Sequence, residues 1–437
     1  MKRIGLGILC VLFGSISARA LDVTVLSESD PAQRLPGISA PGGTTLNYSV
    51  GIGSAAFRHP QDPANVIWTV GDRGPNMTCG EAGKLLSKAI AGLCQKHRNG
   101  RVYPMPDYTP SIYKVELDLA GKSFRVLDTI PVKTRSGKPI AGLLNPQTKA
   151  TKDTGLDMAG TVLPDNADNL DLEGIVRLSD GSFWIGEEMG PSIAHLSADG
   201  RILRRFVPEN QVDDYRSSEA EIIGALPAIL SRRQGNRGIE SMAISPDEQF
   251  LYFIIQNPLA NPNAATYEKS RNSRLFKFDR VAGKLVGEWV YQLDEPRTFA
   301  LDPSEKQNDP RISELTALGP DRLLVLERTE KTTKLHEIVL AGATNILGSA
   351  WDRIETSPSL EAENDLAKLS LVPVAKSLRF DSARDFPGAP EKIEGVAFLG
   401  DGAMVLINDN DFGIRGDQTR ILIVRGAVSP DASVYRR

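Results

Sequence analysis

The sequence predicts an all-β fold, a β-propeller of five or six four-stranded blades with long inter-strand insertions. Three observations support this prediction. A hairpin pattern recurs five times along the chain, further short strands follow most copies, and strand-like segments near both ends can pair with each other. Repeats of this length, built from short strands and tight turns, are typical of propellers.

The clearest copy of the hairpin covers residues 172–188. Its two apolar flanks, 172–178 and 182–188, are joined by Ser179-Asp180-Gly181. An Asp-Gly pair between β-branched and aromatic runs is a strong hairpin signal. Strands over 192–196 and 202–207 complete a predicted blade of four antiparallel strands.

The other copies share this layout of strand, turn and strand. They cover residues 51–73, 238–256, 312–328 and 393–411. Third and fourth strands can be traced after most of them, as at 274–279 and 286–293.

The number of blades depends on segments without a clear pattern. Residues 130–170 or 341–390 are the candidates for a sixth blade. The segment 22–27 is expected to pair with 420–424, because closing the ring would remove an exposed sheet edge.

Three insertions interrupt the predicted blades. Residues 73–108 carry two cysteines, 131–170 is a loop rich in Gly, Pro, Lys and Asp, and 208–237 has partly helical character. Long loops in a compact fold are usually functional or disordered.

The first twenty residues have the features of a secretory signal. Lys2 and Arg3 precede the apolar run 4–16, and Ala18-Arg19-Ala20 gives a cleavage pattern. The alternative is a short membrane anchor, but the apolar run is too short to span a bilayer comfortably. We therefore expect a signal peptide over 1–20, a single domain over 21–437, and a periplasmic or secreted protein.

The net charge and the hydropathy of the chain limit the kinds of partner that it is expected to bind. The net charge of −4 gives no electrostatic reason to expect nucleic acid or an anionic membrane. No segment beyond the signal is long and apolar enough for a transmembrane helix. We expect a monomer that binds a small anionic ester.

Two cysteines remain once the signal is removed, Cys79 and Cys94. An even count in an exported protein predicts a disulfide, here around a helical segment at 81–93, and two free thiols are the alternative. The four histidines and the spacing of the cysteines match no zinc motif.

Carboxylates recur at matching places in the hairpins. The start of a first strand lies beside the end of the second, so Glu173 should approach Glu187 and Glu188, and Glu314 should approach Glu327. By the same reasoning Glu240 should meet Gln256 and Asn257, and Glu394 should meet Asn408 and Asp409. First strands are innermost, so these residues should meet at one mouth of the channel.

Clustered carboxylates repel one another, and a bound cation relieves the repulsion. Oxygen ligands favour Ca²⁺, with Mg²⁺ as the second choice. The predicted metal ligands are Asp72, Glu173, Glu187, Glu240, Glu314, Glu394 and Asp409. The segment 408–413 also resembles the start of a calcium loop, without the distal glutamate of an EF-hand.

Two other roles stay open for these charges. Repeat glutamates can accept hydrogen bonds from backbone N–H groups of neighbouring blades and only hold the ring together. Arg73, Arg237 and Arg328 can form internal ion pairs, or can bind an anionic substrate.

Other catalytic designs are absent from the sequence. There is no G-x-S-x-G elbow, P-loop or dinucleotide fingerprint. Hydrolysis would need a metal-activated water and a carboxylate as general base. The predicted catalytic residues are Glu173, Glu240, Arg237 and Arg328.

Several blocks of the chain resemble a known family. Residues 171–176, 183–191 and 236–240, together with 313–315, 326–328 and 343–348, are similar to the bacterial phytase-like family, also described as having esterase-like activity of phytase. The resemblance covers about 45–427. It implies an exported propeller that hydrolyses phosphate or carboxylate esters, with Ca²⁺ in an acidic channel.

The chain departs from propeller phytases in lacking a lysine-rich phosphate cradle, which puts phytate itself in doubt. A non-catalytic ligand- or protein-binding propeller of the cell envelope is the alternative function, because no complete catalytic signature is present.

Overall fold

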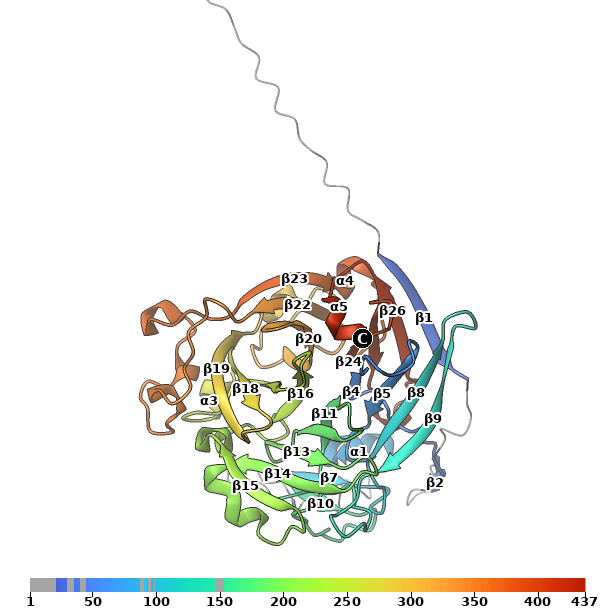
Figure 1. Cartoon of the computed structure of the whole chain (residues 1–437). Coiled ribbons are helices and arrows are strands. Elements are labelled where there is room, and N and C mark those ends of the chain that lie inside the picture. Colours follow the sequence, from blue (N-terminus) through green and yellow to red (C-terminus); the bar gives the residue numbers. More distant parts are fainter. Residues whose placement is uncertain are drawn as a thin grey trace, which may run out of the picture.

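The computed structural model describes residues 21–29, 35–39, 45–86, 90, 92, 96–97, 99–146 and 153–436. The predicted signal peptide and Cys94 lie outside the described residues. Figure 1 shows the described strands arranged in a ring of small sheets around a central axis, which confirms the all-β propeller fold.

Five strands in the described part of the chain lie innermost, and each contacts the next around the ring. They are β4 (Ala55–Phe57), β11 (Leu172–Arg177), β16 (Ile239–Ile244), β20 (Arg311–Gly319) and β24 (Ile393–Phe398). Each begins a group of four strands that pair in succession. We name each group by its inner strand.

The second strands pair antiparallel with the inner strands. They are β5 (Val66–Val70), β12 (Phe183–Glu187), β17 (Phe250–Ile255), β21 (Arg322–Arg328) and β25 (Met404–Asn408). The third strands are β8 (Ser111–Asp118), β13 (Ser192–Leu196), β18 (Asn272–Asp279), β22 (Thr333–Val339) and β26 (Arg420–Arg425). The outer strands are β9 (Ser123–Pro131), β14 (Ile202–Pro208), β19 (Lys284–Gln292), β23 (Ala375–Asp381) and β1 (Asp22–Glu28).

The chain closes its ring as predicted. β1 is antiparallel to β26, with Asp22 opposite Arg425 and Ser27 opposite Arg420. A short parallel pairing of β1 with β9 joins the β24 and β4 groups into one eight-stranded sheet. Neither 130–170 nor 341–390 adds a further four-stranded group within the described residues, and the second segment supplies β23.

The core consists of apolar layers between neighbouring groups. One such layer packs Trp184 of the β11 group against Phe253 and Phe276 of the β16 group. Because the middle strands are buried on both faces, their sequences are continuous apolar runs, such as residues 250–255.

The turns inside the hairpins follow their local sequence. In the β11 group, Gly181 takes a φ of +87° and donates its N–H to Leu178 O at 3.0 Å. Asp180 Oδ1 accepts the N–H of Ser182 at 2.9 Å. Glycine suits this turn because residues with a Cβ rarely adopt a positive φ.

Insertions cover the outside of the ring. The strands β6 (Met77–Thr78), β7 (Gly100–Val102) and β10 (Thr154–Leu156) form a small sheet beside α1 (Cys79–Leu85). The predicted partly helical segment 208–237 holds η3 (Glu209–Tyr215) and η4 (Ala228–Arg232), and its strand β15 (Glu221–Leu226) runs parallel to β14.

The remaining elements are short. They are β2 (Ile38–Ser39), β3 (Thr45–Leu46), α3 (Ala264–Tyr267), η5 (Pro296–Thr298), η6 (Ala350–Asp352), η7 (Leu360–Ala362), η8 (Leu366–Leu369), α4 (Ser382–Asp385), η9 (Asp411–Gly413) and α5 (Ala432–Tyr435). No helix in the described ranges is long and apolar enough to cross a membrane.

Candidate functional site

A β-bulge occurs at the start of four inner strands. In the β11 group the register shifts between Leu172 and Gly174, which leaves Glu173 unpaired. The same shift isolates Glu240 in β16, Ser313 in β20 and Glu394 in β24. A bulge re-aims the side chain of the extra residue, and bulges are common beside functional sites.

The bulged residues define a ring of side chains. Ala55 pairs with Val70 as Gly174 pairs with Gly186, so Ser54 takes the corresponding position in the β4 group. We call Ser54, Glu173, Glu240, Ser313 and Glu394 the bulge ring.

A second ring follows the ends of the second strands. Counting from the same pairs gives the strand-end ring, which consists of Asp72, Glu188, Gln256, Arg328 and Asp409. All members of both rings except Ser313 line one cavity with a volume of about 160 Å³. The sheets thus place nine of these ten side chains around one cavity.

Five of the seven predicted metal ligands line this cavity. They are Asp72, Glu173, Glu240, Glu394 and Asp409. The cavity is also lined by Arg237 and Arg328, so all four predicted catalytic residues lie in one place. Their roles as ligands or catalysts stay predictions.

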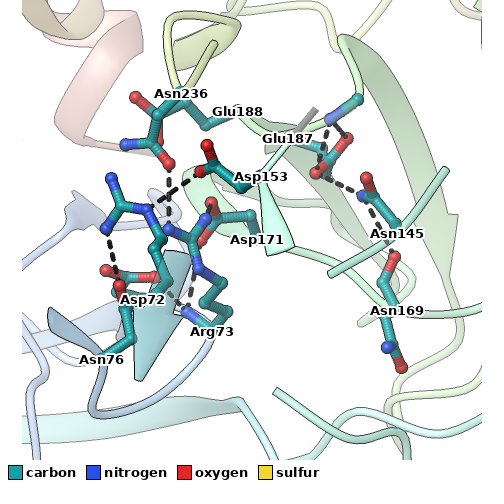
Figure 2. A network of polar contacts seen from close by, with 12 residues as sticks. Asp72, Arg73, Asn76, Asn145, Asp153, Asn169, Asp171, Glu187, Glu188 and Asn236 are labelled. Carbon is teal, nitrogen blue, oxygen red and sulfur yellow. Dashed lines mark hydrogen bonds and ion pairs between the residues drawn. The ribbon is translucent and has the colours of Figure 1, made fainter. Parts of the chain in front are cut away.

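Glu187 does not belong to this mouth, which corrects the sequence-based prediction. Its carboxylate is buried, accepts a hydrogen bond from Asn145 Nδ2 at 2.7 Å, and pairs with Arg205 at 3.0 Å. Figure 2 shows Glu187 with Asn145, apart from the group around Arg73. Neighbouring residues of a strand point to opposite faces of the sheet, so Glu188, and not Glu187, lines the cavity.

Glu314 is the second correction, and it has the same cause. The bulge in β20 falls on Ser313, so Glu314 occupies the place that Gly174 and Gly395 hold in their groups. Its carboxylate accepts backbone N–H groups from Ala56 at 3.2 Å and Met242 at 3.4 Å. This residue therefore links inner strands, the structural alternative that the sequence left open.

The predicted partner of Glu314 is also turned away from the mouth. The carboxylate of Glu327 pairs with Lys376 at 2.7 Å, and Asp294 and His336 lie close to it. Because Lys334 and Lys376 both pair with Asp294, these acidic groups already have cations and do not suit a metal.

The acidic side of the cavity centres on Asp72, Asp171 and Glu173. Each offers a carboxylate oxygen, and the three oxygens lie within 4.8 Å of one another. Burial raises the pKa of Glu173 well above its ordinary value, and Asp72 and Asp171 raise it further. Burial also raises the pKa of Asp72, chiefly with Asp171, whereas Arg73 opposes that rise.

Asp171 was not among the predicted ligands, although it stands two residues before Glu173. It forms an ion pair with Arg73, which also donates to Asn236 Oδ1 at 2.9 Å. Figure 2 shows Arg73 between Asp171 and Asn236. The three clustered carboxylates thus share Arg73, and their combined negative charge when ionised exceeds its single positive charge.

Glu188 extends the acidic side. Burial and the nearby Glu240 raise its pKa to about 8, against the opposing effect of Arg237. Arg237 Nη1 lies 3.7 Å from Glu188 Oε1, and that oxygen has no hydrogen-bond partner within the described part of the chain. The oxygen is therefore free to bind a cation or a water.

The basic side is formed by Arg237, Arg311 and Arg328. Burial, together with the guanidinium groups of Arg328 and Arg237, lowers the pKa of Arg311 to about 10. No carboxylate within 4 Å pairs with Arg311 among the described residues. Three close guanidinium groups are suited to an anion. Arg311 was missed because it starts a strand that reads as an ordinary repeat.

In the segment 408–413, which resembles the start of a calcium loop, a lysine side chain already pairs with the carboxylates. Lys392 Nζ lies 2.7 Å from Asp409 Oδ2 and also pairs with Asp411. Asp411 begins η9, a short turn rather than an extended ligand loop. This pairing makes Asp409 a weaker candidate ligand than Glu173.

The insertion with α1 supplies one wall of the cavity, through Glu81 and Leu85. Arg415, which also lines the cavity, pairs with Glu81. The predicted helix over 81–93 is described as α1, Cys79–Leu85. The pairing of Cys79 with Cys94 stays a prediction.

Comparison with known proteins identifies the family. The model of the phytase-like family, described as "Esterase-like activity of phytase", matches residues 88–412. This chain belongs to the phytase-like family. The match includes most of the cavity residues, from Arg101 to Phe412.

A curated relative and several solved structures are also similar to this family member. An "Uncharacterized secreted protein" of Arthroderma benhamiae is 31% identical over 164 residues, which cover 34% of this chain and 31% of that protein. A luciferin-regenerating enzyme matches 95% of this chain and 100% of its own, at 10% identity and a TM-score of 0.35. Streptogramin B lyase matches 93% of this chain and 98% of its own, at 12% identity and a TM-score of 0.32.

Proposed function

We propose that this phytase-like protein is an exported hydrolase of phosphate or carboxylate esters that depends on a divalent cation. Ca²⁺ is the first choice and Mg²⁺ the second. The observation that carries the proposal is the division of one cavity into two sides: carboxylates with excess negative charge face three arginines. A substrate with an anionic group fits between them.

The residues present suit a hard cation. Asp72, Asp171 and Glu173 offer oxygens close enough to share one ion, and carboxylate oxygens are the ligands that Ca²⁺ prefers. The orphaned Oε1 of Glu188 offers a further donor. A bound divalent cation would supply Lewis acidity and lower the pKa of a coordinated water.

On the opposite side, the arginines would bind and orient the anionic group of the ester. Arg311 suits this role because no carboxylate of the described residues lies within ion-pair distance of it. Arg328 is fixed in place by Glu394 and donates to Ser313 Oγ at 3.0 Å. Bidentate guanidinium groups recognise planar or tetrahedral oxyanions well.

Glu240 lies between these two sides. Its Oε2 accepts a hydrogen bond from Ser313 Oγ at 2.9 Å, and Ser313 in turn contacts Arg328. This chain of contacts holds the Glu240 carboxylate in the cavity with its other oxygen available. We assign Glu240 the role of the general base that takes a proton from the attacking water.

Export is part of the proposal. The pattern over 1–20 predicts a cleaved signal, and the relative from Arthroderma benhamiae is described as secreted. A periplasmic or extracellular location also supplies Ca²⁺ in excess, which suits a site of moderate affinity.

A panel of esters tests the function. Purified mature chain should hydrolyse at least one phosphate or carboxylate ester in Ca²⁺ or Mg²⁺, and excess EDTA should abolish the activity. Arg311→Gln should lower kcat/KM by about tenfold to hundredfold, the value of a charge-assisted contact. Arg379→Gln, an exposed arginine paired with Glu337, is the matched control and should have no effect.

Failure of every ester to react in the presence of either metal would contradict the proposal. Activity that EDTA leaves intact would contradict its metal dependence. The first result would favour the non-catalytic binding propeller.

A further inference from the structure

Gln256 is an unusual member of the strand-end ring. It is 0% exposed, lines the cavity, and follows directly after β17. Neither Oε1 nor Nε2 of its carboxamide has a hydrogen-bond partner among the described residues. A buried amide with both ends unsatisfied destabilises the folded state, because neither end regains the hydrogen bonds that it makes to water.

The backbone fixes the place of this side chain. Gln256 N–H donates to Gly238 O at 2.8 Å, and Gln256 O accepts from Ile312 N–H at 3.0 Å. These bonds tie Gln256 to both the β16 and the β20 groups. The residue therefore cannot move away from the cavity without breaking the ring.

Other members of the strand-end ring have partners from the chain itself. Arg328 pairs with Glu394, and Asp409 pairs with Lys392. Gln256, by contrast, is neutral, and the described residues offer its side chain neither a donor nor an acceptor. An unsatisfied buried polar side chain at the mouth of a charged cavity calls for a ligand group.

The position of Gln256 shows which part of a ligand it would meet. It belongs to the same group as Glu240, and its backbone bond to Ile312, the residue that follows Arg311, brings it to the part of the cavity that Arg311 lines. It thus lies where the acidic and the basic sides of the cavity meet. A neutral side chain there is suited to an uncharged part of the substrate, beside the reacting ester.

A hydroxyl group matches this side chain chemically. The carboxamide offers one acceptor and two donors, and a hydroxyl can donate to Oε1 or accept from Nε2. Ser54 supports the same conclusion independently: its Oγ is 1% exposed, lines the same cavity, and has no partner in the described part of the chain.

We propose that Gln256 is a specificity-determining residue that binds a hydroxyl group of the substrate, so that the preferred substrates are esters of polyhydroxy alcohols. This inference rests on the proposed function, whose cavity it refines. It selects among anionic esters by the alcohol that they carry, and alkyl esters of the same charge should be poor substrates.

Two phosphate esters that differ only in hydroxyl groups test the inference, namely glycerol 2-phosphate and isopropyl phosphate. Wild-type protein should prefer glycerol 2-phosphate by about tenfold or more in kcat/KM, since a site that hydrogen-bonds a hydroxyl rejects an analogue without it. In Gln256→Met, which keeps the length of the side chain and removes the amide, the ratio should fall toward one. If carboxylate esters are the substrates, glyceryl and isopropyl esters of one acid replace this pair.

Stability supplies a readout that does not depend on activity. Because the described residues give the Gln256 amide no hydrogen-bond partner, Gln256→Met should melt at the wild-type temperature or above it. The control is Gln292→Met, whose Nε2 donates to Asn272 Oδ1 at 2.9 Å and to Asn364 O at 2.8 Å. The control should lower the melting temperature and leave the substrate ratio unchanged.

Calorimetric binding of the two phosphate esters in EDTA separates this inference from the proposed function. Tighter binding of glycerol 2-phosphate that Gln256→Met abolishes would support the inference even if nothing is hydrolysed. Equal binding and equal turnover of both esters by the wild type would overturn it, whereas hydrolysis itself would still stand. A marked loss of stability in Gln256→Met would also overturn it, because the amide would then have a structural role.

Discussion

Replacing Glu173 with Gln should have opposite effects on stability with and without calcium. The side chain keeps its size and loses its charge. In chelator, Glu173→Gln should raise the free energy of unfolding, because burial and the neighbouring carboxylates disfavour the charged form of Glu173. In calcium the variant should gain less free energy of unfolding from the bound ion than the wild type does, because the ion loses one charged ligand.

The size of the calcium effect follows from linkage. A ligand that binds only the folded state at a thousand-fold excess over its Kd adds about 4 kcal/mol to the free energy of unfolding. If loss of one charged ligand weakens binding about a hundredfold, about 2.7 kcal/mol of that gain disappears. Urea unfolding of wild type and variant, each in millimolar Ca²⁺ and in EDTA, measures all four values.

Glu116→Gln is the matched control. Glu116 is paired with Arg125 on the outside of the ring, away from the cavity. It should change stability little and keep the full calcium gain. An equal calcium gain in wild type and Glu173→Gln would refute the assignment of Glu173 as a ligand. A fall in stability of the variant in EDTA would refute the argument from carboxylate repulsion.

Three further predictions concern the same molecule. In EDTA the free energy of unfolding should decrease as the pH rises from about 4.5 to about 8. The reason is that Glu188 keeps its proton in the folded state over this range and releases it in the unfolded state. Calcium should flatten this slope. Urea titrations across that range check the sign, and a slope that rises with pH would contradict it. Glu314→Gln should destabilise the ring by about 2 kcal/mol and retain the calcium gain, because two inner-strand N–H groups bond to the two oxygens of Glu314 and Gln keeps only one acceptor oxygen. Unfolding curves in both buffers decide this. Thiol counting under denaturing, non-reducing conditions should find Cys79 and Cys94 joined, and two reactive thiols would show that they are not.

The fold could be predicted because its signals are local and repeated. Asp180-Gly181 between apolar runs identifies a hairpin, and continuous runs such as 250–255 identify strands buried on both faces. The pairing of β1 with β26 followed from the need to remove a sheet edge. Residues 208–237 were less predictable, because β15 joins its sheet through a parallel pairing that leaves no hairpin signal.

The candidate site was predictable to within one residue in each strand. Glu187 and Glu314 were wrong for the same reason: a bulge shifts the register, and a shift of one residue turns a side chain to the other face. A closer comparison of the repeats could have corrected Glu314. The order apolar, Glu, small in Leu172-Glu173-Gly174 is reversed to apolar, small, Glu at 312–314.

Charge balance could not be predicted from the repeats. The pairing of Arg328 with Glu394, and the lack of an ion-pair partner for Arg311 among the described residues, depend on side chains from different groups that only the folded ring brings together. Sequence order carries no information on which of two acidic residues already has a cation.

The pairing of β1 with β26 has a consequence for how the protein is made. Asp22 and Arg425 lie far apart in the sequence, so the ring cannot close until β26 has been synthesised. Until then β1 lacks its antiparallel partner and leaves an open edge, which invites pairing with other chains. Contacts between such distant residues also form slowly. The step of folding most exposed to aggregation is thus ring closure, when β1 meets β26.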